Sequence, residues 1–240
     1  MVGRGSNELA SAVNVILDDV VTAHHQTNSF ILWSDSCVAQ NRNRMMCYAL
    51  KIFLLKHPGI TITQKFCTPG HSSIQEIDNV HSHIEKRLKV SEIYSPLSLM
   101  TVLKRVRPEK MVVVQLRPEK IYDYEHAANQ FTFKDIPFTR VKALRRVSSL
   151  PLHIQYKTDF HSDYIEVCIT RATRSAIKLG NLLVPGSLKK LPSISVEKKK
   201  DIESMLKFMP KDDRLYMKKL TDEEKNTYYA NTTRLSLSSV

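Results

Sequence analysis

The first candidate site follows a short apolar segment near the start of the chain. Residues 30–33 (Phe-Ile-Leu-Trp) predict a fully buried strand that ends at Asp35. Gln40, Asn41 and Asn43 come next and place side-chain donors and acceptors at the start of a predicted helix. Sites in open α/β sheets lie at the carboxyl ends of strands, where a carboxylate can bind a divalent cation and amides can orient it. The alternative is that Asp35, Ser36 and Asn41 only cap the following helix.

A second polar cluster follows the next predicted strand. Its members are His71, Glu76, Asp78, His81 and Glu85. Asp78, His81 and Glu85 are spaced i, i+3 and i+7, so they share one helical face. Asp35 and Asp78 could together hold Mg²⁺ or Mn²⁺, as carboxylates from two elements do in phosphoryl-transfer sites. His71 or His81 could orient a ligand or carry a proton. The alternative is a solvated helix face with one histidine at the edge of the core.

Hydrophobic periodicity in the first half of the chain predicts the elements that position these residues. Helices are expected at 8–21, 43–56, 74–89 and 96–107, and strands at 30–33, 60–66 and 111–116. Helices alternating with buried strands are typical of a layered α/β sheet.

The pattern changes after residue 130. Three strands, expected to be antiparallel, are predicted at 140–147, 152–157 and 164–170, and short helices at 195–209 and 213–220. We therefore divide the chain into an α/β core (1–130), a basic antiparallel β extension (131–185), a short helical segment (186–220) and a poorly ordered tail (221–240).

The net charge of +12 is concentrated in one part of the chain. Residues 1–84 are neutral, so residues 85–240 carry the whole excess. A basic surface attracts nucleic acid through phosphate contacts and counterion release, although a solvated lysine-rich surface has the same composition. The candidate phosphate contacts are Arg140, Lys142, Arg145, Arg146, Lys198, Lys199 and Lys200. If alternate strand residues face one way, Arg140, Lys142 and Arg146 form a ladder on one sheet face.

Composition also excludes several classes of protein. An apolar fraction of 42% argues against wholesale disorder. Lys51 interrupts the best apolar run, so no segment reaches a membrane-spanning length. The four cysteines never form a C-x-x-C pair, which predicts buried free thiols in a reducing, intracellular compartment.

Both polar clusters lie in motifs that resemble a known family. These are Ser34-Asp35-Ser36-Cys37, Gln40-Asn41-Arg42-Asn43, Lys65-Phe66, Gly70-His71-Ser72, Asp78 and His81-Ser82-His83-Ile84-Glu85. They are similar to the pattern of uncharacterised, largely transposon-derived animal proteins with a domain of unknown function. The resemblance implies a partial RNase H-like fold of the transposase and integrase kind, with Asp35 and Asp78 as its acidic residues.

The chain departs from the family pattern at two points. Ala39 stands where the family usually has glycine before the glutamine. The chain also begins at the family's lead-in motif, so we expect an N-terminal truncation that lacks the first strands and their acidic residue. We therefore expect a nuclear protein that binds nucleic acid, DNA before RNA, without competent catalysis. The alternatives are an active metal-dependent nuclease or transposase, and a protein–protein scaffold.

Overall fold

The computed structural model describes the chain in two compact units. The described residues are 5–67, 76–170, 185–187 and 194–222. One unit, which we call the sheet unit, comprises Val2–Ser72 and Pro118–Lys190. The other, the helical unit, comprises Ser73–Arg117 and Leu191–Val240. The division does not follow the expected boundaries at residues 130, 185 and 220. Each unit contains two segments that are distant in the sequence.

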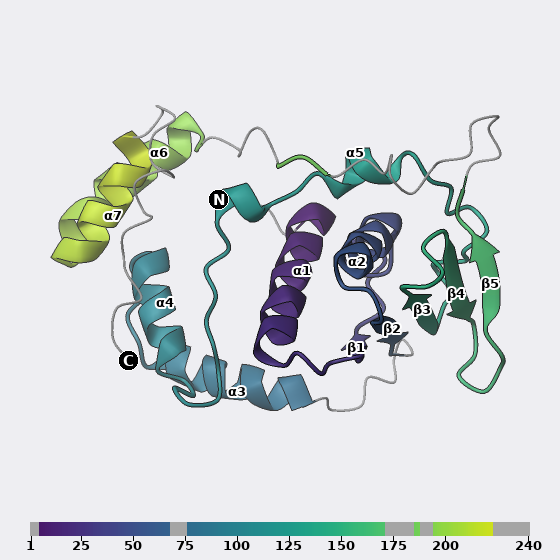
Figure 1. The fold of residues 1–240 in the computed structure, drawn as a ribbon. Coiled ribbons are helices and arrows are strands. Elements are labelled where there is room, and N and C mark those ends of the chain that lie inside the picture. Colours follow the sequence, from purple (N-terminus) through teal and green to yellow (C-terminus); the bar gives the residue numbers. More distant parts are fainter. Residues whose placement is uncertain (1–4, 68–75, 171–184, 188–193, 223–240) are drawn as a thin grey trace. The chain divides into compact units, whose positions relative to one another are not determined.

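A five-stranded mixed sheet forms the centre of the sheet unit (Figure 1). Its strands, in spatial order, are β1 (Ser29–Ser34), β2 (Thr61–Phe66), β3 (Ala143–Val147), β4 (His153–Lys157) and β5 (Ile165–Cys168). β1 and β2 are parallel, and every later pairing is antiparallel. The mixed α/β class and the three antiparallel strands expected after residue 130 are therefore confirmed.

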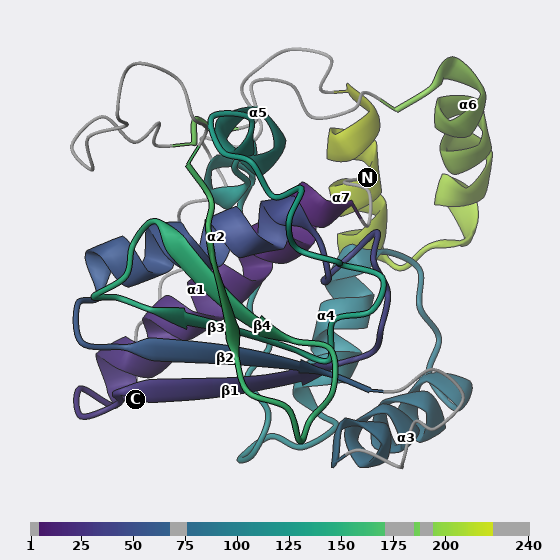
Figure 2. The same ribbon diagram turned by 90° about the vertical axis from the view of Figure 1, so that its right-hand side faces the viewer.

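Helices α1 (Ser6–Ala23), α2 (Arg44–Lys56) and α5 (Tyr124–Ala128) complete the sheet unit, with the short 3₁₀ turn η1 (Pro118–Lys120). α2 connects β1 to β2, because two parallel strands need a crossover between them. It packs against α1 and α5. In Figure 2, β3 and β4 lie in front of α1 and α2, so these helices cover one face of the sheet.

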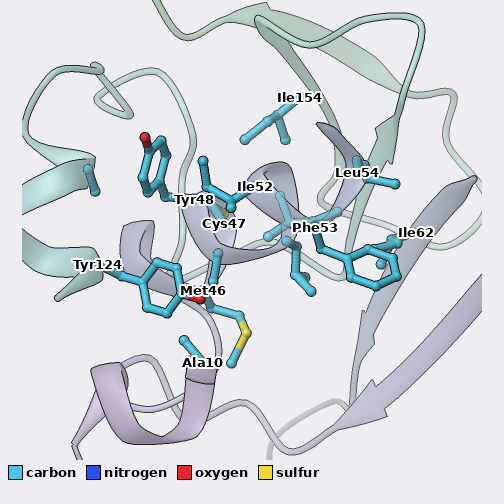
Figure 3. Packing of buried hydrophobic residues seen from close by; sticks show 14 of the residues in the cluster. Ala10, Met46, Cys47, Tyr48, Ile52, Phe53, Leu54, Ile62, Tyr124 and Ile154 are labelled. Carbon is cyan, nitrogen blue, oxygen red and sulfur yellow. The ribbon is translucent and has the colours of Figure 1, made fainter. Parts of the chain in front are cut away.

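The core of the sheet unit is built around α2 (Figure 3). Every residue from Met46 to Leu54 is buried, and the apolar ones pack with Ile62 of β2 and Ile154 of β4. Tyr124 of α5 enters the same core, and its hydroxyl accepts a hydrogen bond from Asn14 Nδ2 (2.9 Å). Burial raises the pKa of Tyr124 to about 12, so the ring stays neutral at ordinary pH.

The helical unit contains four α-helices among its described residues. They are α3 (Glu76–Lys89), α4 (Pro96–Lys104), α6 (Val196–Met205) and α7 (Lys211–Asp222), with the 3₁₀ turn η3 (Leu206–Phe208) after α6. Ser95 caps α4 in a reciprocal capping box with Ser98, and Pro96 occupies the first turn. The buried hydroxyl of Ser95 also donates to Asp213 of α7, which ties these two helices together.

The strand expected at residues 111–116 is absent. This segment (Met-Val-Val-Val-Gln-Leu) has no regular secondary structure, and Val112 is 87% exposed. β-branched residues favour a strand only where a neighbouring strand and a core accept them, because strand propensity is a packing preference. The expectation of a fully buried strand at 30–33 is also wrong, since Ile31 and Trp33 of β1 are exposed. The tail after Asp222 lies outside the described residues.

Candidate functional site

Asp35 lies at the carboxyl end of β1, where the sequence placed it. It is exposed, and its Oδ1 accepts hydrogen bonds from Asn41 Nδ2 (2.6 Å) and from the backbone N–H of Cys37 (3.2 Å). The second bond closes an Asx turn directly after the strand. The carboxylate therefore holds the β1–α2 loop together.

The other amide side chains of the same loop make different contacts. Asn43 caps α2, because its Oδ1 accepts from the N–H of Met46 (3.0 Å). Its Nδ2 donates to the carbonyl of Val38 (3.0 Å). Gln40 is half-buried in the turn before the helix. The capping alternative named Asp35, Ser36 and Asn41, whereas the residue that caps α2 is Asn43.

Arg42 is a buried cation within this loop. Its Nη1 donates to the carbonyl of Val141 (3.2 Å), and its guanidinium lies 5.7 Å from the centre of the Phe66 ring. Burial lowers the pKa of Arg42, and the negative charge of Asp35 opposes that shift. The negative charge of Asp35 therefore also helps to keep the buried Arg42 protonated.

The described members of the second polar cluster belong to the helical unit. Asp78, His81 and Glu85 are exposed on α3, Glu76 begins this helix, and His71 lies outside the described residues. Asp35 belongs to the sheet unit, and each unit is described by itself. The shared metal site of Asp35 and Asp78 stays a prediction. Within the described part of the chain, no group of three or more His, Cys, Asp or Glu side chains could hold a metal ion.

The basic residues around β3 do not share one face of the sheet as expected. β3 begins at Ala143, so Arg140 and Lys142 precede the strand, where Arg140 is exposed and Lys142 is half-buried. Arg146 is fully buried, and its Nη2 donates to Cys47 Sγ (2.8 Å). The ladder expected from Arg140, Lys142 and Arg146 is therefore absent. Neighbouring strand residues point to opposite faces, so Arg145 points away from the helices that cover Arg146.

The remaining candidate cations belong to the helical unit. Lys198 and Lys200 are exposed on α6, and Lys199 is half-buried there.

Cations and aromatic rings gather on the sheet face opposite α1 and α2. Phe30 and Leu32 of β1 pack into the core, so Trp33 points to the other face. Strand pairing sets Trp33 beside Lys65, Lys65 beside Ala143, and Ala143 beside Lys157. We call the following residues the aromatic–basic face: Trp33, Lys65, Arg145, Lys157, Phe160 and Tyr164.

Each cation of this face lies over a ring. Lys65 Nζ is 5.1 Å from the centre of the Trp33 ring, while Lys157 Nζ and Arg145 Cζ are 4.5 and 5.5 Å from that of Tyr164. Phe160, in the β4–β5 connection, adds a second ring 6.1 Å from Trp33. Cation–π contacts hold the long basic side chains near the rings without neutralising their charge. A carboxylate, Glu166 of β5, lies at the margin, where Gln155 Nε2 donates to it (2.9 Å).

Sequence reasoning missed most of this face. Of its six residues only Arg145 was a candidate, because the run Phe-Ile-Leu-Trp predicted burial on both sides. The signal available in the sequence was the alternation of side chains along each strand, because residues two positions apart lie on the same face. Such alternation could have assigned Trp33, Lys65, Arg145 and Lys157 each to one face of its own strand. Which strands pair, and in which register, could not be read from that alternation.

The sheet unit also has two cavities, the second of which has Trp33 among its lining residues. One, of about 960 Å³, is open to solvent at the start of α2, beside Phe131 and Cys168. The other is a groove of about 410 Å³ between α1 and β1. All four cysteines are free; Cys47 is buried as expected, whereas Cys168 is exposed. Among the described helices, none is long and apolar enough to cross a membrane.

Comparisons with known proteins add nothing to these observations: no protein-family model, no curated protein and no solved structure matches the chain.

Proposed function

We propose that this chain binds nucleic acid through the aromatic–basic face and does not itself catalyse a reaction. The observation that carries the proposal is the set of Lys65, Arg145 and Lys157 on one sheet face. Among the described residues, no carboxylate forms an ion pair with any of these three cations, so their charges remain available to phosphates. A net charge of +12 adds long-range attraction for a polyanion.

The contacts of Asp35 support a binding role rather than a catalytic one. Its Oδ1 accepts hydrogen bonds from two amide groups of its own loop, so the carboxylate has a structural role there. We further propose descent from an RNase H-like, transposon-derived protein. Support comes from the motifs around Asp35 and from its position at the end of the first of two parallel strands. A DNA partner would place the protein in the nucleus.

Binding is tested by fluorescence anisotropy with labelled DNA and RNA over a series of salt concentrations. We compare the wild type with the triple variant Lys65→Ala, Arg145→Ala, Lys157→Ala. The matched control replaces the exposed Lys56, Lys120 and Lys134 of the same unit by alanine, with the same change in net charge.

We expect the face variant to lose at least about tenfold in affinity at low salt. Its salt slope should be smaller by about two, since each phosphate contact contributes roughly 0.7 to 0.9 to that slope. The control should bind nearly as well as the wild type. Absence of binding at low salt, or equal losses in both triple variants, would refute the proposal. The protein–protein scaffold would then be the better interpretation.

A further inference from the structure

We infer that the aromatic–basic face binds single-stranded nucleic acid, with unpaired bases stacked on Trp33 and Phe160. This inference rests on the proposed function and deepens it, because it names the form of nucleic acid and the way it is held. Three features of the face carry it: exposed rings, cations beside those rings, and their arrangement in a row across the strands.

The first feature is the exposure of two neighbouring rings. Trp33 is 53% exposed and Phe160 39% exposed, and their planes are tilted by 42° at a centroid distance of 6.1 Å. Burying a large aromatic surface is favourable, so a planar partner that covers this exposed pair of rings gains binding free energy. Every base has a π face, so such a pair accepts bases with little regard to sequence.

The second feature is the placement of cations beside the rings. Lys65 lies over Trp33, and Lys157 and Arg145 lie over Tyr164. A base stacked on Trp33 would bring its own phosphate within reach of the Lys65 ammonium. The next phosphates along the strand could then meet Lys157 and Arg145. This combination of stacking rings with a basic track is the general means of binding single strands.

The third feature is the geometry of the row. Strand pairing joins Trp33 of β1, Lys65 of β2 and Lys157 of β4 in one register line across the sheet. Neighbouring strands are about 4.8 Å apart, so this line spans roughly 14 Å, which suits a stretch of a few nucleotides. The bases of a duplex are stacked on each other and cannot lie flat on a ring. A single strand can therefore use all three features, and a duplex only the cations.

The chain offers a direct probe, because Trp33 is its one tryptophan. We titrate the full chain with oligothymidylate and follow tryptophan emission. The comparisons are a duplex and an abasic oligonucleotide of equal length. Stacking on Trp33 should quench the emission with oligothymidylate, while the duplex and the abasic strand should bind more weakly and leave it nearly unchanged.

Substitutions then test each ring by anisotropy. Trp33→Ala and Phe160→Ala should each weaken binding to oligothymidylate by about tenfold, within the range found for loss of one stacking ring. Trp33→Phe keeps a ring and should retain most of the affinity. The matched control is Phe208→Ala in the helical unit. Phe208 is 70% exposed, and the centre of its ring lies 4.8 Å from Lys207 Nζ. Circular dichroism confirms that each variant is folded.

The outcomes separate this inference from the proposed function. If no nucleic acid binds, the proposed function fails and the inference fails with it. If both oligothymidylate and duplex bind equally, without quenching and without a loss in Trp33→Ala, nucleic-acid binding stands but the stacking inference is overturned. Quenching by oligothymidylate, together with a loss of affinity in Trp33→Ala and Phe160→Ala but not in Trp33→Phe or Phe208→Ala, establishes it.

Discussion

Lys51 lies on the buried side of α2, where its Nζ donates to the carbonyl of Leu150 (2.7 Å). Burial, reinforced by the nearby positive charge of Arg146, lowers the pKa of Lys51 from 10.5 to about 7. Glu166 and Cys47 act in the opposite direction but less strongly. The folded chain thus carries an unusually costly cation below neutral pH.

Lys51 should make the stability of the protein depend on pH. Between pH 7 and 10.5 the unfolded chain binds a proton at Lys51 that the folded chain does not. The free energy of unfolding should therefore rise with pH in this window, by up to about 1.4 kcal/mol per pH unit. Below pH 7 both the folded and the unfolded chain bind this proton, so the slope disappears and the folded chain bears the full cost of the buried charge. Lys51→Met should remove this slope when urea unfolding is measured from pH 6 to 10.

The control for this experiment is Lys56→Met, since Lys56 is exposed on the same helix. It should keep the slope of the wild type. Equal slopes in the wild type and in Lys51→Met would show that the folded chain protonates Lys51 as readily as the unfolded one.

Asp35 should contribute to stability through its loop. Asp35→Ala removes the acceptor of the hydrogen bonds from Asn41 and Cys37, and should lower the free energy of unfolding by about 1 to 2 kcal/mol. Asp35→Asn keeps an acceptor for the N–H of Cys37 and should cost less. Urea unfolding measures both variants.

The same pair of variants tests the competing metal site at Asp35. Millimolar Mg²⁺ or Mn²⁺ should stabilise the wild type no more than Asp35→Asn. A metal-dependent increase in stability that Asp35→Asn abolishes, or metal-dependent DNA cleavage with the same sensitivity, would restore the nuclease interpretation.

Several elements were predictable because their signals are local. The stop of α2 before Pro58-Gly59 and the cap of α4 at Ser95-Pro96 were correct, since capping depends on neighbouring residues. The prediction of a strand at the valine-rich segment 111–116 was wrong, because a strand needs partners that its own residues do not specify. At the candidate site, the loop position of Asp35 was predictable, but the burial of Arg146 depended on the register of β3.

The cap of α4 is also a point where an element can be weakened selectively. Ser95→Ala removes both the cap and the hydroxyl that donates to the buried Asp213 carboxylate, so it should destabilise the helical unit by about 1 to 3 kcal/mol. Ser195→Ala at the exposed cap of α6 is the control and should cost less. Thermal unfolding followed by circular dichroism compares the two, and equal losses would mean that the Asp213 contact contributes nothing.

At the scale of the whole molecule, burial differs sharply between the two units. Nine residues of α2 are buried in the core of the sheet unit, whereas α4 and α6 of the helical unit contain no buried residue. Because apolar burial supplies most of the free energy of folding, the helical unit should open far more readily.

Hydrogen exchange followed by mass spectrometry measures this difference segment by segment. Amides of α2, β2 and β3 should exchange only through global unfolding and show the greatest protection. Amides of α4 and α6 should exchange faster, through local opening. Lys51→Met, measured below pH 7, should slow exchange in α2, β2 and β3 and leave α4 and α6 unchanged, because Lys51 belongs to the sheet unit. Equal protection in α2 and α4, or slowing in both units together, would show that the chain opens as one cooperative body.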